Sequence, residues 1–136
     1  MDGLNTGNFF PGLPQPYSDR FVSQIWADKV LYQDGELGLG WTVAITVPDL
    51  ETWTLTNLWF WHDSGSDVAV RVRYTPKGAV AADKYIIWGR TLTAAYPTYM
   101  LSCIQKVLEG GSEIAVYAGV ASVLNVCLEG QVLVSQ

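Results

Sequence analysis

The chain is a succession of short apolar runs separated by turn residues, with no long segment that shows a helical period of 3.6 residues. Turn segments such as QDGELGLG, PDLE, DSGS and EGG are rich in glycine, proline, serine and acidic residues. The apolar runs from residue 21 onward are FVSQIWADKVLY, GWTVAITV, TWTLTNLWFWH, DVAVRVRYT, KYIIWGRTL, TYMLSCIQKVL, SEIAVYAG and SVLNVCLEGQVLV. This spacing predicts an all-β fold: an antiparallel β-sandwich, jelly-roll-like, with about eight strands over residues 21–136.

Alternation is clearest in DVAVRVRYT. Val68, Val70 and Val72 fall on one face of the expected strand and are predicted to enter the core. Arg71 and Arg73 fall on the other face, where the simplest interpretation is a solvated surface. The alternative is that both arginines form salt bridges with a neighbouring subunit.

Residues 1–20, MDGLNTGNFFPGLPQPYSDR, follow neither a strand nor a helix period. They carry three of the six prolines and three of the thirteen glycines, which favours an extended path. A disordered tail is one interpretation, but Phe9, Phe10, Leu13 and Tyr17 are more apolar than disordered segments usually are. We expect an extended N-terminal arm that docks on a neighbour.

Composition limits the possible partners. Charged residues make up only 15% of the 136 residues, against about a quarter in an average soluble domain, so much of the surface is expected to face protein, in a homo-oligomer. The net charge of −5 argues against nucleic acid. The chain has no secretory signal pattern and no membrane-spanning run, and Cys103 and Cys127 lie in apolar runs, as expected of free thiols in the cytoplasm.

The sequence offers little chemistry for catalysis. His62 is the only histidine, and Asp63 beside it would point to the opposite face of a strand, so no catalytic triad is predicted. The carboxylates Asp63, Asp67 and Asp83 do not follow a calcium-loop spacing. We predict a protein that is not an enzyme, with no catalytic residue, no metal and no cofactor.

The stretch NLWFWHDSGSD contains the most unusual residues. Strict alternation places Trp53, Leu55, Asn57, Trp59 and Trp61 on one face of the strand, and Thr54, Thr56, Leu58, Phe60 and His62 on the other. Both faces are apolar near the end of the run, so alternation leaves open which face is buried. The two tryptophans, Trp59 and Trp61, have three open roles: core packing, an interface with a subunit or another protein, or a platform for a sugar ring.

Between Trp41 and Val134 the chain resembles small β-sandwich structural proteins of tailed bacteriophages. The resemblance rests on the order and spacing of TVAITVPDLETWTLTNLWFWHDSGSDVAVRV, VAADKYIIWGRTL, VLEGGSEIAVYAG and SVLNVCLEG. It implies that positions 58 and 60 are the regular core positions, and that the indoles at 59 and 61 lie outside the sandwich. Residues 1–20 have no counterpart in the pattern.

The resemblance also implies a virion protein that assembles in the host cytoplasm. We expect a capsid decoration or cement protein that stabilises the shell through oligomeric β-sandwich contacts and the N-terminal arm. A homotrimer is favoured, in contact with the major capsid protein or other virion proteins. The alternative is a tail or fibre module that binds a receptor glycan through its exposed tryptophans. The expected interface residues are Phe9, Phe10, Leu13, Tyr17, Trp59, Trp61, Arg71 and Arg73.

Overall fold

The structure is a computed structural model that describes residues 24–102 and 104–135. The larger of two compact units spans Asp28–Val132 and holds most of the chain. The expected arm, residues 1–20, lies outside the described residues, as does Cys103. No helix in the described part is long and apolar enough to cross a membrane.

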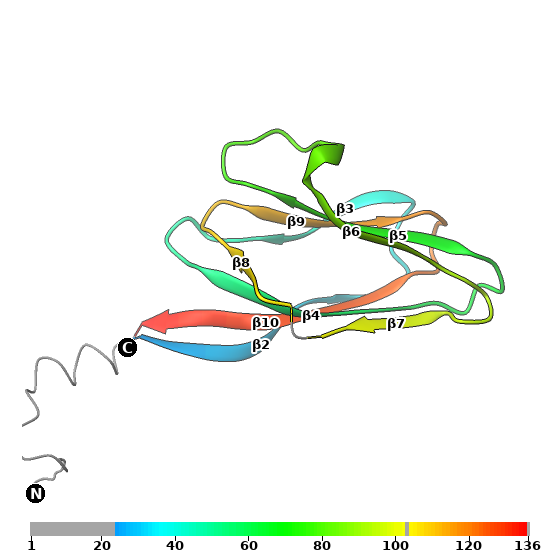
Figure 1. Ribbon diagram of the computed structural model, residues 1–136, viewed down its shortest axis with the longest axis horizontal. Coiled ribbons are helices and arrows are strands. Elements are labelled where there is room, and N and C mark those ends of the chain that lie inside the picture. Colours follow the sequence, from blue (N-terminus) through cyan, green and yellow to red (C-terminus); the bar gives the residue numbers. More distant parts are fainter. Residues whose placement is uncertain (1–23, 103, 136) are drawn as a thin grey trace, which may run out of the picture. The chain divides into compact units, whose positions relative to one another are not determined.

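Two antiparallel sheets form the fold. One contains β2 (Gln24–Asp34), β10 (Asn125–Ser135), β4 (Trp53–Trp61) and β7 (Thr98–Leu101) in that order, with β8 (Lys106–Leu108) also paired to β4. The other contains β3 (Gly40–Thr46), β9 (Glu113–Ala118), β5 (Val68–Thr75) and β6 (Ile86–Leu92). A short 3-10 turn, η1 (Asp83–Tyr85), precedes β6. Figure 1 shows the two sheets as separate layers.

The strand order is that of a jelly roll. Both β7 and β8 pair with β4, at Trp61–Leu58 and Leu55–Trp53 respectively, so together they act as one interrupted strand. Counting them as one gives eight strands within the described residues, in which the first pairs with the eighth, the second with the seventh, the third with the sixth, and the fourth with the fifth. This confirms the predicted sandwich, and each predicted run corresponds to one of the eight strands.

The core lies between the two sheets. As predicted, Val68, Val70 and Val72 of β5 are completely buried, and Leu58 and Phe60 of β4 face them from the other layer. The remaining buried apolar side chains complete the same cluster, and they include Ile45, Val47, Leu92, Leu108, Ile114, Val116, Leu124, Val126 and Leu128. Burial of this continuous cluster is the main source of stability for the sandwich.

A bulge in β4 changes which of its residues face the core. On the β10 side, Glu129 pairs with Asn57 and Gly130 pairs with Leu55, so Thr56 has no partner. The extra residue resets the alternation, and Leu55 therefore lies in the core with Leu58 and Phe60. The prediction that Leu55 shares a face with Trp59 and Trp61 was wrong, because strict alternation does not hold across a bulge.

Candidate interaction surface

The outer face of β4 carries Asn57, Trp59 and Trp61. Beyond the Thr56 bulge the strand alternates regularly, and since Leu58, Phe60 and His62 are buried, these three side chains point away from the other sheet. The Trp59 side chain is 40% exposed and Trp61 is half-buried. Their ring centroids are 5.0 Å apart at an interplanar angle of 44°. The expectation that both indoles lie outside the sandwich is met.

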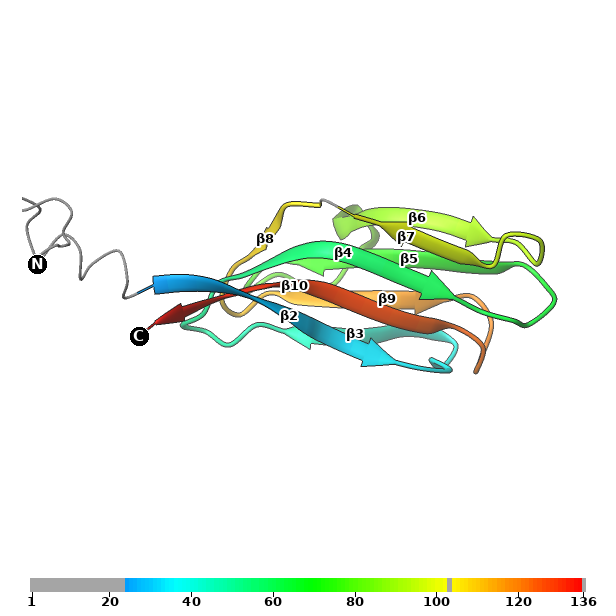
Figure 2. The ribbon, with the colours of Figure 1, turned by 90° about the horizontal axis from the view of Figure 1, so that it is seen from below.

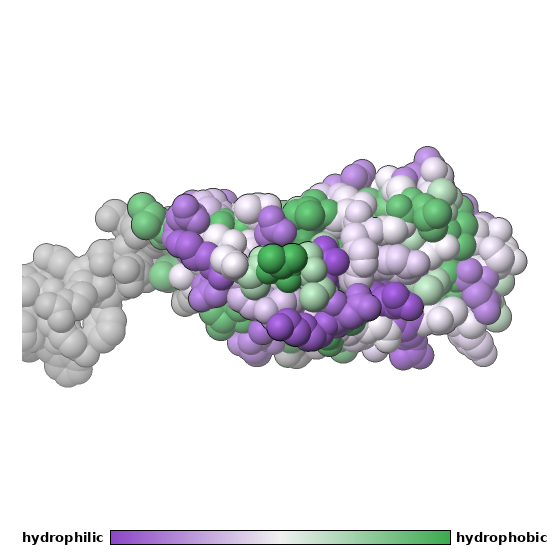
Figure 3. Space-filling view, turned by 90° about the horizontal axis from the view of Figure 1, so that it is seen from above, coloured by the Kyte–Doolittle hydropathy of each residue, from purple (hydrophilic) through white to green (hydrophobic). Residues whose placement is uncertain are grey.

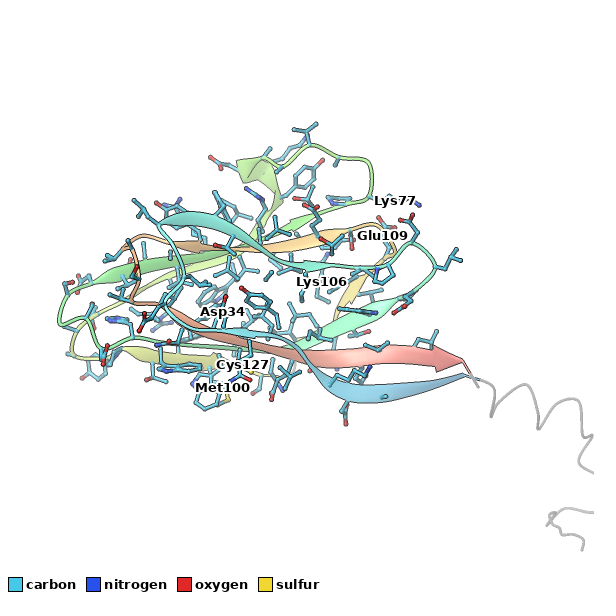
Figure 4. All side chains as sticks on the ribbon, turned by 180° about the vertical axis from the view of Figure 1, so that it is seen from behind. Asp34, Lys77, Met100, Lys106, Glu109 and Cys127 are labelled. Carbon is cyan, nitrogen blue, oxygen red and sulfur yellow. The ribbon has the colours of Figure 1, made fainter. Side chains whose placement is uncertain are left out.

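Neighbouring strands extend this apolar row. Trp59 pairs with Cys127 of β10 on one side and with Met100 of β7 on the other. Met100 is 57% exposed, whereas Cys127 is buried. In Figure 4 the labelled Met100 and Cys127 lie close together on the side of their sheet that faces away from the other layer. Figure 2 views the sandwich from this side, with β10 and β4 in the foreground. We call Trp59, Trp61 and Met100 the tryptophan face.

Cys127 is the buried member of this row. It is a free thiol, as predicted, and it contributes no disulfide. Burial raises the pKa of the Cys127 thiol above its ordinary value, and the negative charge of Glu129 adds a smaller increase. The thiol is therefore neutral near pH 7 and behaves as a small apolar side chain.

A polar concavity of about 460 Å³ lies where β2, β10 and the β4 bulge meet. Asn57 donates from Nδ2 to Oε1 of Glu129 at 3.1 Å, and Gln131 donates from Nε2 to Oδ1 of Asp28 at 2.9 Å. Asn57 and Glu129 are cross-strand partners one step along the outer face from the Trp59–Cys127 pair. The concavity therefore borders the tryptophan face. Lys29 and Val30 complete its rim.

His62 is buried and both of its ring nitrogens form hydrogen bonds to the backbone. Its ring is 3% exposed, and Nδ1 accepts the backbone N–H of Ser64 at 3.3 Å. An accepting Nδ1 leaves the proton on Nε2, which then donates to the Leu92 carbonyl at 3.0 Å. The Ser64 hydroxyl lies 3.1 Å from Nδ1 and also bonds within the turn, where Gly65 has a φ of +77°. His62 thus joins the DSGS turn to β6, and both of its nitrogens are occupied.

Arg71 and Arg73 lie on the outer face of the other sheet, as predicted. The Arg71 guanidinium is centred 4.8 Å above the Tyr117 ring, and that of Arg73 lies 4.2 Å above Trp41. Trp41 and Tyr117 pack edge to face at 5.4 Å. The Nε of Arg73 is buried without a hydrogen-bond partner in the described part of the chain. Figure 3 shows this side of the molecule, where hydrophobic and hydrophilic residues alternate in small patches.

Of the predicted interface residues, the structure brings Trp59 and Trp61 together and places Arg71 and Arg73 on the opposite face. Phe9, Phe10, Leu13 and Tyr17 lie outside the described residues. Within residues 24–102 and 104–135, no group of three or more histidine, cysteine or acidic side chains is arranged to hold a metal ion.

Sequence reasoning missed Met100 and the polar concavity. Alternation could have placed Met100 on one face of its strand. Its pairing with Trp59, however, depends on the strand order, which the sequence does not show. Asp28 and Glu129 are 101 positions apart, and only the pairing of β2 with β10 brings them together. Comparison of the chain with protein-family models and with curated proteins gave no match.

Proposed function

We propose that this chain is a non-enzymatic structural protein of a bacteriophage particle, a capsid decoration or cement protein that stabilises the shell by contacts between β-sandwiches. The observation that carries the proposal is the tryptophan face: two indoles and a methionine, adjacent and outward, on β4 and β7. Tryptophan gives large interface energies at low entropic cost, and adjacent exposed apolar side chains mark surfaces that a partner covers.

The fold is compatible with this role, because the jelly roll is used by viral capsid subunits, although it also serves lectins and enzymes. In the proposal the protein is a homotrimer in the virion, assembled in the host cytoplasm, and its partners are its own copies and the major capsid protein or other virion proteins. The N-terminal arm would add affinity once the sandwich has docked, since its local concentration near the neighbouring subunit is then high.

Removal of the indoles tests the proposal. The double variant Trp59→Ser, Trp61→Ser should remain folded, because both side chains lie outside the core cluster. We expect its self-association and its binding to purified shells to weaken by about tenfold or more. Analytical ultracentrifugation measures the first and co-sedimentation with shells the second.

The control is Leu50→Ser, which removes an exposed apolar side chain from the β3–β4 loop. It should leave both measurements unchanged. If the double variant associates and decorates as the parent does, the tryptophan face is not the contact and the proposal fails.

The arm has its own test. A chain without residues 1–20 should fold normally, because the buried members of the core cluster that the structure describes lie within residues 37–128. Its attachment to shells should be weaker than that of the full chain. Unchanged attachment would show that the arm does not contribute to binding, and it would not bear on the role of the tryptophan face.

A second candidate is a tail or fibre module that binds a receptor glycan. The polar concavity beside Trp59 favours it, since sugars are bound by an indole together with carboxylate and amide groups that bond hydroxyls. Glycan-array binding by the isolated protein, lost in both Trp59→Ala and Asn57→Ala, would select this function. Array binding that survives both substitutions, or none at all, would reject this site.

A further inference from the structure

The turn between β6 and β7 contains a second concavity, of about 150 Å³. These two strands are the edge strands of different sheets, so the concavity lies at the open side of the sandwich. Figure 1 shows β6 and β7 in different layers, and Figure 2 shows the turn that joins them at one end of the sandwich. Its polar and aromatic lining is Arg90, Thr91, Thr93, Tyr96, Thr98 and Tyr99.

A column of stacked rings holds the cationic group of this concavity. Phe60 in the core stacks on Trp88 with centroids 5.2 Å apart and planes at 10°. Trp88 stacks in turn on Tyr99 at 5.4 Å, and the Arg90 guanidinium lies 4.5 Å above the Tyr99 ring. Stacking occupies the face of a guanidinium and leaves its N–H donors free in the plane.

Among the residues that the structure describes, no acidic side chain lines the concavity. Within the part of the chain that the structure describes, the ion pair formed is Lys77–Asp49, which involves neither Arg90 nor its neighbours. Arg90 therefore presents a positive charge, with the donor geometry that matches a carboxylate, at a concave site.

The rest of the lining supplies hydroxyl groups. Thr93 Oγ1 accepts the backbone N–H of Tyr96 at 3.1 Å, and it keeps its own proton for donation. Thr91 and Thr98 are exposed, and Tyr96 is 79% exposed, so its ring and phenol are both accessible. A ligand that fits this set has one anionic group, several hydroxyls and a ring face.

We propose that the β6–β7 concavity binds an acidic sugar, a pyranose with one carboxylate. The carboxylate pairs with Arg90, ring hydroxyls bond the threonines, and a C–H face of the sugar covers Tyr96. This inference does not rest on the proposed structural role, and it uses residues separate from the tryptophan face and from the concavity at Asp28.

Stacking of an arginine on a ring is not enough by itself to mark a site, because Arg71 makes the same contact with Tyr117 on the outer face of its sheet. What distinguishes Arg90 is the concavity with its hydroxyl lining. Arg71 is therefore the matched control for a substitution at Arg90.

The test is titration of the full chain with glucuronic acid and with N-acetylneuraminic acid, followed by ¹⁵N NMR chemical shifts. Glucose, acetate and inorganic phosphate are the comparison ligands. We expect saturable binding of at least one acidic sugar, at least about tenfold tighter than that of the three comparison ligands, with shifts at residues 90–99.

Arg90→Gln should reduce the affinity for the acidic sugar to that for glucose, while Arg71→Gln should leave it unchanged. Tyr96→Ala should weaken binding of the acidic sugar without removing its preference over glucose. The proposal is overturned if neither acidic sugar binds saturably, if glucose or phosphate binds equally well, or if Arg90→Gln has no effect. Thermal unfolding of each variant identifies a loss of binding that comes from misfolding.

Discussion

Cys127 lies on the outer row of β10, between Glu129 on its own strand and Trp59 on the neighbouring strand. Its raised pKa means that little reactive thiolate exists near pH 7. We therefore expect a thiol reagent to modify Cys127 more slowly than it modifies the amino acid cysteine in solution. The rate should rise with pH over a range displaced upward from the ordinary thiol pKa. A Cys103→Ser background isolates the signal, and absorbance of the released chromophore measures it.

Trp59→Ala in the same background should increase the Cys127 modification rate severalfold at fixed pH, because it removes the cross-strand neighbour of the thiol. Trp61→Ala is the matched control. Trp61 pairs with Asn125 rather than with Cys127, so its removal should have a smaller effect. Equal rates in the parent and in Trp59→Ala would mean that the indole does not shield the thiol.

His62 gives a second prediction at this scale. His62→Ala leaves the Leu92 carbonyl and the Ser64 N–H without their buried partner, which should lower the free energy of unfolding by about 1–3 kcal/mol. Asp63→Ala should change it by less than about 0.5 kcal/mol, because Asp63 is exposed. Urea unfolding followed by fluorescence measures both. If His62→Ala left the free energy of unfolding unchanged, that result would contradict the proposed link between the DSGS turn and β6.

At the scale of elements, the sequence was sufficient for the eight strands and for the orientation of β5, because alternation from Val68 to Val72 is uninterrupted. It was not sufficient for β4. The bulge at Thr56 is fixed by partners distant in the sequence, since Thr56 Oγ1 donates to the Glu129 carbonyl at 3.2 Å and the Ile104 N–H donates to the Thr56 carbonyl at 2.9 Å. Local alternation contains no information about either partner.

The same limit applies to the candidate sites. The sequence shows that the indoles at 59 and 61 share one face of the strand. Their outward orientation required the resemblance, because alternation alone allows either this face or the face of Leu58 and Phe60 to be the buried one. The rim of the polar concavity and the stacking of Arg90 on Tyr99 depend on which strands are neighbours. Strand order in a jelly roll is set by pairing over long sequence separations, which no local pattern reports.

The bulge also explains Gly130, which gives an element-scale prediction. A Cβ at Gly130 would collide with the Thr54 carbonyl oxygen and with Leu31 Cδ1, because β10 approaches β4 closely opposite the bulge. Gly130→Ala should therefore destabilise the protein by about 2 kcal/mol. Gly38→Ala is the matched control, since a Cβ at Gly38 meets no atom of the described residues within 4 Å. Similar urea midpoints for the two variants would show that the close approach does not constrain β10.

At the scale of the whole molecule, the low charge content and the tryptophan face lead to a prediction about salt. A contact made by indoles and methionine is mainly apolar, so self-association should change little between about 0.05 and 0.5 M salt, a range over which ionic contacts between exposed groups are strongly screened. Sedimentation equilibrium at several salt concentrations measures this.

The opposite result would point to the other sheet. Arg71 and Arg73 are the stacked cations of that face, and a chain with 13 acidic residues offers many carboxylates to them. If moderate salt dissociates the oligomer, and Arg71→Gln with Arg73→Gln abolishes that salt dependence, then these arginines anchor the assembly. If instead the oligomer resists salt and the variant Trp59→Ser, Trp61→Ser dissociates, the tryptophan face forms the contact. The two results are distinct because added salt weakens charge pairing but not apolar burial, whereas loss of the indoles weakens apolar burial but not charge pairing.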